Sequence, residues 1–357
     1  MSQPTKRRRS AWPAVALTAA VLGAAAPAGA FTGPIVVKSG LDNPRGMNFG
    51  ADNALFVAEA GRGGTRCTRG VCGGATGAIA RLQGDRLERI FTGLASIGPR
   101  GGVDVTGPHD VGIAIVSGRV YVVVGDGGVR RPQGFSSRLA RQLGRLLRVN
   151  ALGPGSLEIL AGLSAFEQEN NPDRGARRSD PSGVAIDGMQ RWVADAGANA
   201  LLLERDGNVS LGGVFPRAAG SASSPAAVRL GTDGALYVGE FAANAKVWRV
   251  APGGQPTVFA RGFSRITGLS FGPDGSLYVA EHGASSGGRT PRGAIVRLPP
   301  GGGARETIGR GRLRFPGGVA VRSDGVIFAS NYSIRPGRPV SRGPFPRRTG
   351  QIVRFNP

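Results

Sequence analysis

The sequence has 357 residues, a formal net charge of +22, 61 glycines and 25 prolines. Only 6% of the residues are aromatic and no nucleic-acid-binding motif is present, so the charge does not indicate a nucleic-acid partner. Basic loops would favour an anionic cell-surface polymer, such as an acidic polysaccharide. The joint abundance of Arg, Ala, Gly and Pro also indicates a compositional bias, which produces positive charge without any functional cause.

The first 30 residues are typical of a cleaved signal peptide. Lys6 to Arg9 are basic, residues 14–26 are apolar and rich in Ala, and residues 28–30 form a small-x-small cleavage site. The alternative is a membrane anchor, but the apolar segment is shorter than the ~20 residues that a span needs. We expect cleavage after Ala30 and secretion of residues 31–357 as one domain with no transmembrane segment.

Six similar segments follow one another along the chain. Each has an apolar strand, a short turn and a second apolar strand that ends on an acidic or polar residue. The turns often contain Asp-Gly or a related pair, which supplies the positive φ angles of tight hairpins. A repeat of this length predicts an all-β fold, a six-bladed β-propeller. The segments are residues 46–59, 111–125, 183–195, 227–240, 268–281 and 318–331.

Each blade is expected to have four strands, and the ring should close through its two ends. Third strands carry an Arg signature, as in residues 246–250, and fourth strands an apolar segment followed by Gly, as in residues 257–263. The sixth repeat ends after its third strand. Residues 35–41 have the pattern of a fourth strand, so we expect this N-terminal strand to pair with the C-terminal blade and remove an exposed sheet edge.

The hairpin turns all fall on one face of the ring, and the long insertions fall on the other. We call the second face, where first strands begin and second strands end, the top face. Long loops on a rigid scaffold commonly carry function. The insertions are residues 60–76, 95–107, 125–143, 164–180, 282–292 and 331–349.

The two cysteines lie close together in the first insertion. Because export leads to an oxidising compartment, we expect a Cys67–Cys72 disulfide. The alternative is a redox-active or metal-binding pair, but two thiols alone make a poor metal site.

Oxygen-bearing side chains end five of the second strands. If they converge on the axis, they could hold a divalent metal such as calcium, or act in acid–base chemistry. The alternative is that they cap strand ends and bond turn amides. These residues are Glu59, Asp195, Glu240, Glu281 and Asn331.

A second group of candidates lies where first strands begin. His109 and Asp110 precede the second repeat, Arg45 occupies the matching place in the first, and Asp126 follows the second strand of the second repeat. We predict these four residues as ligand-binding candidates at the channel mouth. His109 could act as a base, a ligand or a hydrogen-bonding strut. His282 follows Glu281 and is expected near the same mouth or exposed to solvent.

The loops around the mouth are rich in arginine. Such a collar would suit an anionic ligand, although solvated loops in a biased composition would look the same. Residues 166–173 are acidic by contrast, and we expect them to form a lid over the top face. The arginines are Arg130, Arg131, Arg138, Arg141, Arg174, Arg177, Arg178, Arg335, Arg338, Arg342, Arg347 and Arg348.

The chain resembles the ScyD/ScyE family of exported proteins, which is related to NHL-repeat propellers. The resemblance rests on residues 40–46, residues 56–64 with the Cys67/Cys72 pair, residues 107–110 and 166–173, and the Pro-Asp-Gly-Ser-Leu-Tyr-Val repeats. It covers essentially all of residues 31–357. It implies an extracytoplasmic propeller, and most members of the family have no assigned activity.

The sequence favours a binding protein over an enzyme. It has no Gly-x-Ser-x-Gly, His-Glu-x-x-His or phosphate-loop motif. We therefore expect an exported propeller that binds a small-molecule or protein ligand at the top of its central channel. The alternative is a metal-dependent, lactonase-like hydrolase or a quinone-dependent oxidoreductase that uses the same mouth, since six-bladed relatives of both kinds are known.

Overall fold

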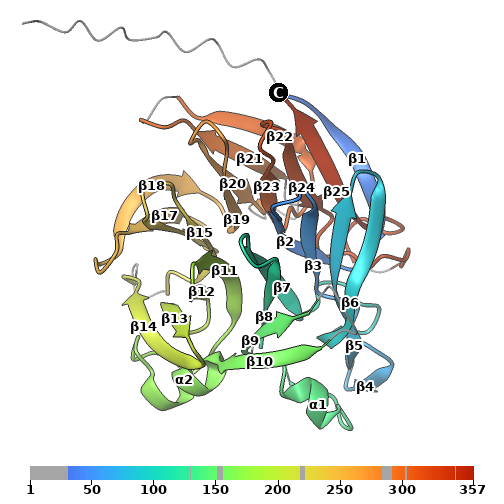
Figure 1. Ribbon diagram of the computed structural model, residues 1–357. Helices are drawn as coiled ribbons and strands as arrows, with labels where there is room; N and C mark the ends of the chain where they lie inside the picture. The colour runs from blue at the N-terminus through green and yellow to red at the C-terminus, as the bar shows by residue number, and fades with distance from the viewer. Residues whose placement is uncertain are drawn as a thin grey trace, which may run out of the picture. The chain divides into compact units, whose positions relative to one another are not determined.

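The computed structural model describes residues 31–357, except 127, 129, 151–155, 218–221, 284–291, 302–303 and 342. Residues 1–30, which contain the predicted signal peptide, lie outside the described part of the chain. Six antiparallel sheets stand around one axis (Figure 1). The chain is therefore a six-bladed β-propeller, as the repeats predict. No helix in the described part is both long and apolar enough to cross a membrane.

Each blade has four strands in a shared order, from the axis outward. The innermost strands are β2 (Pro44–Phe49), β7 (Pro108–Ala114), β11 (Pro181–Asp187), β15 (Pro225–Leu230), β19 (Ile266–Phe271) and β23 (Val319–Val321). The second strands are β3 (Leu55–Glu59), β8 (Arg119–Val124), β12 (Gln190–Asp195), β16 (Leu236–Glu240), β20 (Leu277–Glu281) and β24 (Ile327–Asn331). The third strands are β5 (Val71–Gln83), β9 (Arg145–Val149), β13 (Ala200–Arg205), β17 (Ala245–Val250), β21 (Gly293–Leu298) and β25 (Gly350–Asn356). The outer strands are β6 (Arg86–Pro99), β10 (Leu157–Gly162), β14 (Asn208–Val214), β18 (Thr257–Phe263), β22 (Glu306–Leu313) and β1 (Thr32–Leu41).

The ring closes through its N-terminal strand, as predicted. β1 pairs antiparallel with β25, with Val36 opposite Val353 and Ser39 opposite Gln351. The last blade thus takes its outer strand from the start of the described chain and its other three from the end (Figure 1). This pairing covers the edge of β25 that would otherwise be exposed.

The core lies between neighbouring blades, because each sheet buries both of its faces against the next. One buried cluster, for example, joins Ile79 and Leu94 of the first blade to Val111 and Leu147 of the second. Near the axis the innermost strands approach so closely that five of the six blades have Gly or Ala at the point of contact. A Cβ on Gly183 would lie 2.8 Å from Cα of Ala227 in the next blade.

The first insertion is a hairpin rather than an irregular loop. β4 (Arg66–Thr68) pairs with the first residues of β5, and Cys67 lies opposite Cys72. The predicted Cys67–Cys72 disulfide is present and crosslinks these two strands. It therefore stabilises the tip of a β-ribbon that extends the first blade.

Two short helices lie in the insertions, and neither is expected from the sequence. They are α1 (Ser137–Ala140) and α2 (Leu163–Asn170). Leu163 and Glu167 form the buried face of α2. Residues 166–173, predicted as a lid, are instead part of this helix and the turn after it.

Candidate functional site

Equivalent residues of the six blades surround a cavity of about 530 Å³. Each is the second residue of the segment that leads into the innermost strand, and in five blades the next residue is Gly or Ala. Because they share one place in the repeat, they form a ring around the channel mouth at the top face. The six are Arg45, His109, Ser182, Ala226, Thr267 and Gly317, and all of them line the cavity. The insertions complete the wall with Asp104, Val105, Thr106, Gly128, Arg178, Ser179, Asp180, Ala196, Gly197, Ser224 and Phe241.

Arg45 is the one charged side chain among the six ring residues, and it is partly buried. One of its terminal nitrogens, Nη2, lies 3.1 Å from Oδ1 of Asp104 and donates to the carbonyl of Val105 at 3.0 Å. Its Nε is buried and has no hydrogen-bond partner among the described residues. Asp104 is largely exposed, with 67% of its side-chain surface accessible, whereas the Arg45 side chain is only 16% accessible. Arg45 thus lines the cavity and keeps one donor that the described residues do not use.

Both histidines are neutral at pH 7. Burial, followed by the positive charge of Arg45, lowers the pKa of His109 to about 4, and a hydrogen bond to the Pro181 carbonyl acts in the opposite direction. Burial and Arg45 likewise lower the pKa of His282 to about 4. His282 packs between Phe241 and Phe315, with ring centroids 5.8 and 5.0 Å away. His109 therefore offers the cavity a neutral imidazole, which can donate or accept a hydrogen bond.

An ion pair joins two innermost strands across the ring. Arg229 reaches from β15 to Asp110 on β7, with Nη1 2.7 Å from Oδ2 and Nη2 3.2 Å from Oδ1. The same guanidinium donates to the carbonyls of Val184 and Met47, at 3.2 and 3.1 Å. It thereby contacts four of the six blades. Neither Asp110 nor Arg229 lines the cavity, so Asp110 is not at the channel mouth as we expected but is bound in this ion pair.

Asp110 occupies a place where the other blades have small residues. The equivalent residues are Gly46, Gly183, Ala227, Gly268 and Gly318. Gly46 makes room for the carboxylate, since a Cβ there would lie 2.1 Å from Oδ1 of Asp110. Arg229 is likewise the one long side chain at its own repeat position, where other blades have Asn48, Gly112, Ala185, Ser270 and Ala320. These two exceptions to the repeat were the signal in the sequence for the ion pair. The sequence analysis did not use it and missed Arg229.

The five side chains that end the second strands do not converge on the axis. Glu281 accepts the amide of Ser264 at 2.8 Å, Asn331 that of Arg314 at 2.8 Å, and Glu59 that of Asp42 at 2.6 Å. In each case the acceptor binds an amide 17 residues earlier, in the segment that leads into the innermost strand of its own blade. The expectation of one metal-binding cluster is therefore wrong in its geometry, and the strand-capping alternative describes these three contacts.

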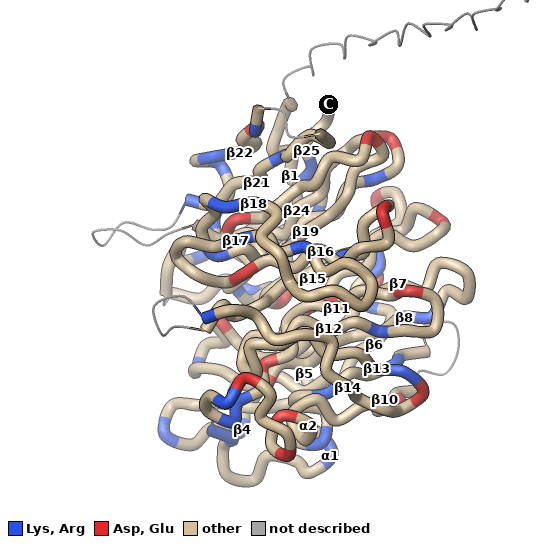
Figure 2. Tube along the Cα trace, turned by 90° about the vertical axis from the view of Figure 1, so that its left-hand side faces the viewer, with Lys and Arg blue, Asp and Glu red and all other residues tan. Residues whose placement is uncertain are grey.

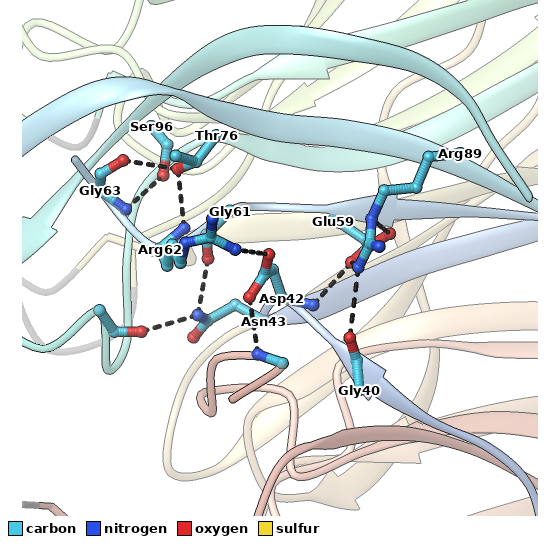
Figure 3. Close-up of polar contacts among 12 residues, drawn as sticks. Gly40, Asp42, Asn43, Glu59, Gly61, Arg62, Gly63, Thr76, Arg89 and Ser96 are labelled. Atoms are coloured by element: carbon cyan, nitrogen blue, oxygen red, sulfur yellow. Dashed lines mark hydrogen bonds and ion pairs between the residues drawn. The ribbon is translucent and has the colours of Figure 1, made fainter. Parts of the chain in front are cut away.

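Both carboxylate oxygens of Glu59 accept hydrogen bonds. Arg89 binds both of its oxygens at 2.8 Å, and Oε2 also accepts the Asp42 amide (Figure 3). Asp42 in turn accepts from Arg62 at 2.8 Å, and Asn43 donates to the carbonyl of Gly61 at 2.7 Å. The network joins the end of β1 to the first blade, and it leaves no oxygen of Glu59 without a donor.

Asp195 and Glu240 are held in similar ways. Asp195 accepts from Ser179 Oγ at 2.5 Å and from the Asp180 amide at 2.7 Å, and burial raises its pKa to about 6. Glu240 accepts from Trp248 Nε1 at 2.6 Å. No three His, Cys, Asp or Glu side chains are grouped for a metal within the described ranges. The five residues thus do not fit a central calcium site.

The remaining predictions on the top face hold only in part. Asp126 is not part of the cavity wall and lies 3.4 Å from Ser164 Oγ, beside α2. Most arginines of the expected collar are exposed, but Arg335 is fully buried and donates to the carbonyls of Arg348 and Val340. Arg342 lies outside the described residues. Figure 2 shows Lys and Arg interspersed with Asp and Glu, rather than one continuous basic face.

Comparison with known proteins finds similarity in structure but not in sequence. No protein-family model and no curated protein sequence matches the chain. Among solved structures, the chain is similar to a calcium-binding protein, regucalcin, from Agrobacterium tumefaciens. That match has 13% identity and a TM-score of 0.55, and covers 91% of this chain and 95% of that one.

Two further structures show the same architecture. One is named as a putative glucose dehydrogenase from Thermus thermophilus and is 18% identical, with a TM-score of 0.54 and coverage of 90% and 99%. The other is a catalytically inactive virginiamycin B lyase from Staphylococcus aureus with quinupristin, 14% identical, with a TM-score of 0.53 and coverage of 92% and 99%. At these identities the likeness shows the six-bladed fold alone.

Proposed function

We propose that this protein is an exported propeller that binds a small anionic molecule in the cavity at the top of its central channel. The observation that carries the proposal is the position of Arg45, whose buried Nε has no partner among the described residues and lies at the ring that surrounds the cavity. A buried guanidinium nitrogen without an acceptor is costly, and a ligand carboxylate or phosphate would supply that acceptor.

The other lining residues suit a molecule that is partly polar and partly apolar. Hydroxyl groups of Ser182 and Thr267, the neutral ring of His109 and the aromatic ring of Phe241 all belong to the wall. The Asp110–Arg229 pair joins innermost strands across the ring, so a ligand would enter and leave through the top face. A concave site with a few convergent polar groups is the usual form of a small-molecule site.

We further propose that the protein belongs with the ScyD/ScyE proteins and that cleavage after Ala30 exports it. Support comes from residues 107–110, which carry part of the resemblance and include His109 of the cavity wall and Asp110 of the central ion pair. The disulfide between Cys67 and Cys72 also supports an oxidising compartment. Sequencing the N-terminus of the protein secreted by its host tests this assignment, with Phe31 as the expected first residue.

An enzymatic function at the same mouth is the second candidate, as a lactonase-like hydrolase or a quinone-dependent oxidoreductase. The observation in its favour is His109, a neutral imidazole at the cavity that could accept a proton. Against the metal-dependent form, the strand-end carboxylates are already bonded within their own blades. Turnover of lactones or of sugars with a quinone acceptor, abolished by His109→Gln, would favour the enzyme.

Binding is tested by thermal unfolding with citrate, gluconate and inorganic phosphate at constant ionic strength. We expect at least one anion to raise the melting temperature of the wild type. Arg45→Gln should weaken that anion's affinity by about tenfold or more, the usual effect of losing a charge-assisted hydrogen bond. The matched control is Arg338→Gln, which removes an exposed loop arginine outside the cavity. Equal losses in both variants would indicate a general effect of charge and would contradict the proposal.

A further inference from the structure

The buried face of α2 carries one residue from each of its two turns. Leu163 packs in the core between the second and third blades, and Glu167 follows four residues later on the same face. Asn171, four residues further on, ends the helix in the left-handed conformation, with φ 40° and ψ 60°. Helical spacing therefore brings Glu167 and Asn171 to the same side.

Glu167 is a buried carboxylate without a hydrogen-bond donor. Its exposure is 0%, and neither Oε1 nor Oε2 has a partner among the residues that the structure describes. The strand-end carboxylates are also buried, but each of them accepts hydrogen bonds from amides or cations. A buried carboxylate is normally paired or bound to a metal. Glu167 thus departs from the pattern of the other buried acids.

Asn171 adds a third oxygen of the same kind. Its Nδ2 donates to the carbonyl of Gly175 at 3.1 Å, which settles which end of the amide is the oxygen. Oδ1 is buried and lacks a donor in the described part of the chain. One turn of helix and its cap therefore supply three buried acceptor oxygens for which the described residues offer no donor.

The charges around Glu167 are mainly negative. The carboxylates of Asp173 and Asp195 act on it through their charge, opposed by Arg177. Arg177 donates to the carbonyl of Gln168, and Asp173 is paired with Arg217 at 2.5 Å. Among the described residues, no cation forms a hydrogen bond with Glu167, so its charge is not neutralised by a bonded partner there.

We propose that Glu167 and Asn171 bind a hard divalent cation, with calcium as the fitting example. Carboxylate and amide oxygens are the ligands that calcium takes, and backbone carbonyls or water complete its coordination. The site is separate from the central cavity and does not depend on the function proposed for it. A bound cation would fix the segment that follows α2, and this segment carries Arg178, Ser179 and Asp180 to the cavity wall.

The test is calorimetric titration of calcium chloride into the protein of residues 31–357, after treatment with a chelator. We expect one calcium per chain and a melting temperature that rises by a few degrees with calcium. Glu167→Gln should abolish both effects, since it keeps the shape and removes the charge. Glu169→Gln changes an exposed carboxylate on the same helix and should behave as the wild type.

A second variant guards against a folding defect in Glu167→Gln. Asn171→Gly keeps the left-handed backbone conformation, which glycine adopts readily, and removes the amide oxygen. It should weaken calcium binding by about tenfold or more, within the range found when one metal-site partner is lost. A wild type that does not respond to calcium, or a Glu167→Gln variant that responds like the wild type, would overturn the proposal.

Discussion

Arg229 on β15 and Asp110 on β7 form a two-pronged ion pair across the central channel, with N–O distances of 2.7 and 3.2 Å. The two side chains come from blades that are not adjacent, since the blade of β11 stands between them. The Val184 amide of that blade also donates to Asp110, at 3.1 Å. With the bond from Arg229 to the Met47 carbonyl, the pair connects four of the six blades.

Removing one partner of this pair should destabilise the ring strongly. Asp110→Ala leaves the Arg229 charge buried, and losses of about 3–5 kcal/mol in unfolding free energy are typical of such a change. The double variant Asp110→Ala with Arg229→Met should recover much of this loss, because neither charge is then left unpaired. Urea unfolding of the two variants measures both values. A single variant as stable as the wild type would show that the pair contributes nothing.

Closure of the ring through β1 should be required for the stability of all six blades. Deletion of residues 31–41 exposes the edge of β25 and leaves the last blade with three strands. We expect a lower melting temperature in a single transition, together with aggregation through the exposed edge. Calorimetry and light scattering detect these effects. A truncated chain that melts as the wild type does would rule out a structural role for β1.

The capping role of the strand-end residues predicts a difference between two substitutions of Glu281. Glu281→Ala leaves the amide of Ser264 without its acceptor and should cost about 1–3 kcal/mol. Glu281→Gln keeps an oxygen at the same place and should cost less. Urea unfolding distinguishes the two. If Glu281→Gln instead released a stoichiometric metal ion, a metal-binding role for these residues would replace the capping role.

The two histidines predict a defined dependence of stability on pH. Their folded pKa values of about 4 lie below the value of about 6.5 in an unfolded chain. The unfolded state therefore binds more protons between these values, so the histidine contribution is present above pH 6.5 and is lost as the pH falls toward 4. The stability of the wild type relative to His282→Gln should fall over the same range.

Proton NMR titration of the two rings checks this account directly. Arg45, Asp104 and Asp110 act on His109, and Arg45, Asp104 and Arg265 act on His282. Because Arg45 lowers the pKa of both rings, Arg45→Gln should raise both values. Ring signals that titrate near pH 6.5 in the wild type would contradict the buried, neutral state of the histidines.

The repeat made the fold predictable, and it also located part of the cavity wall. Arg45 and His109 share one place in the repeat, so aligning the blades was enough to bring them to the same mouth. Arg229 was missed because its side chain acts in a blade two places away, which a repeat taken by itself does not show. The contacts of Glu281 and Asn331 depend on the direction of their side chains. A residue at the end of a second strand can point to the axis of the ring or bond a backbone amide of its own blade, and the sequence does not distinguish the two.

The acidic segment 166–173 was misinterpreted for a related reason. Polar composition suggested a lid over the top face, but Leu163 and Glu167 place one apolar and one acidic residue on the same buried helical face. Amphipathic periodicity does not reveal a helix whose buried face contains a carboxylate. The second site was therefore accessible only from the structure.

The central claim is that the cavity, rather than the arginine-rich loops, binds the ligand. Ala226→Leu tests it most directly, because it adds bulk to the cavity wall and leaves every charged residue in place. The measurement is calorimetric titration of the anion that most stabilises the wild type, at constant ionic strength. We predict that Ala226→Leu abolishes binding while the protein keeps its melting temperature within a few degrees. Unchanged affinity in this variant would place the ligand on the loops and contradict the account.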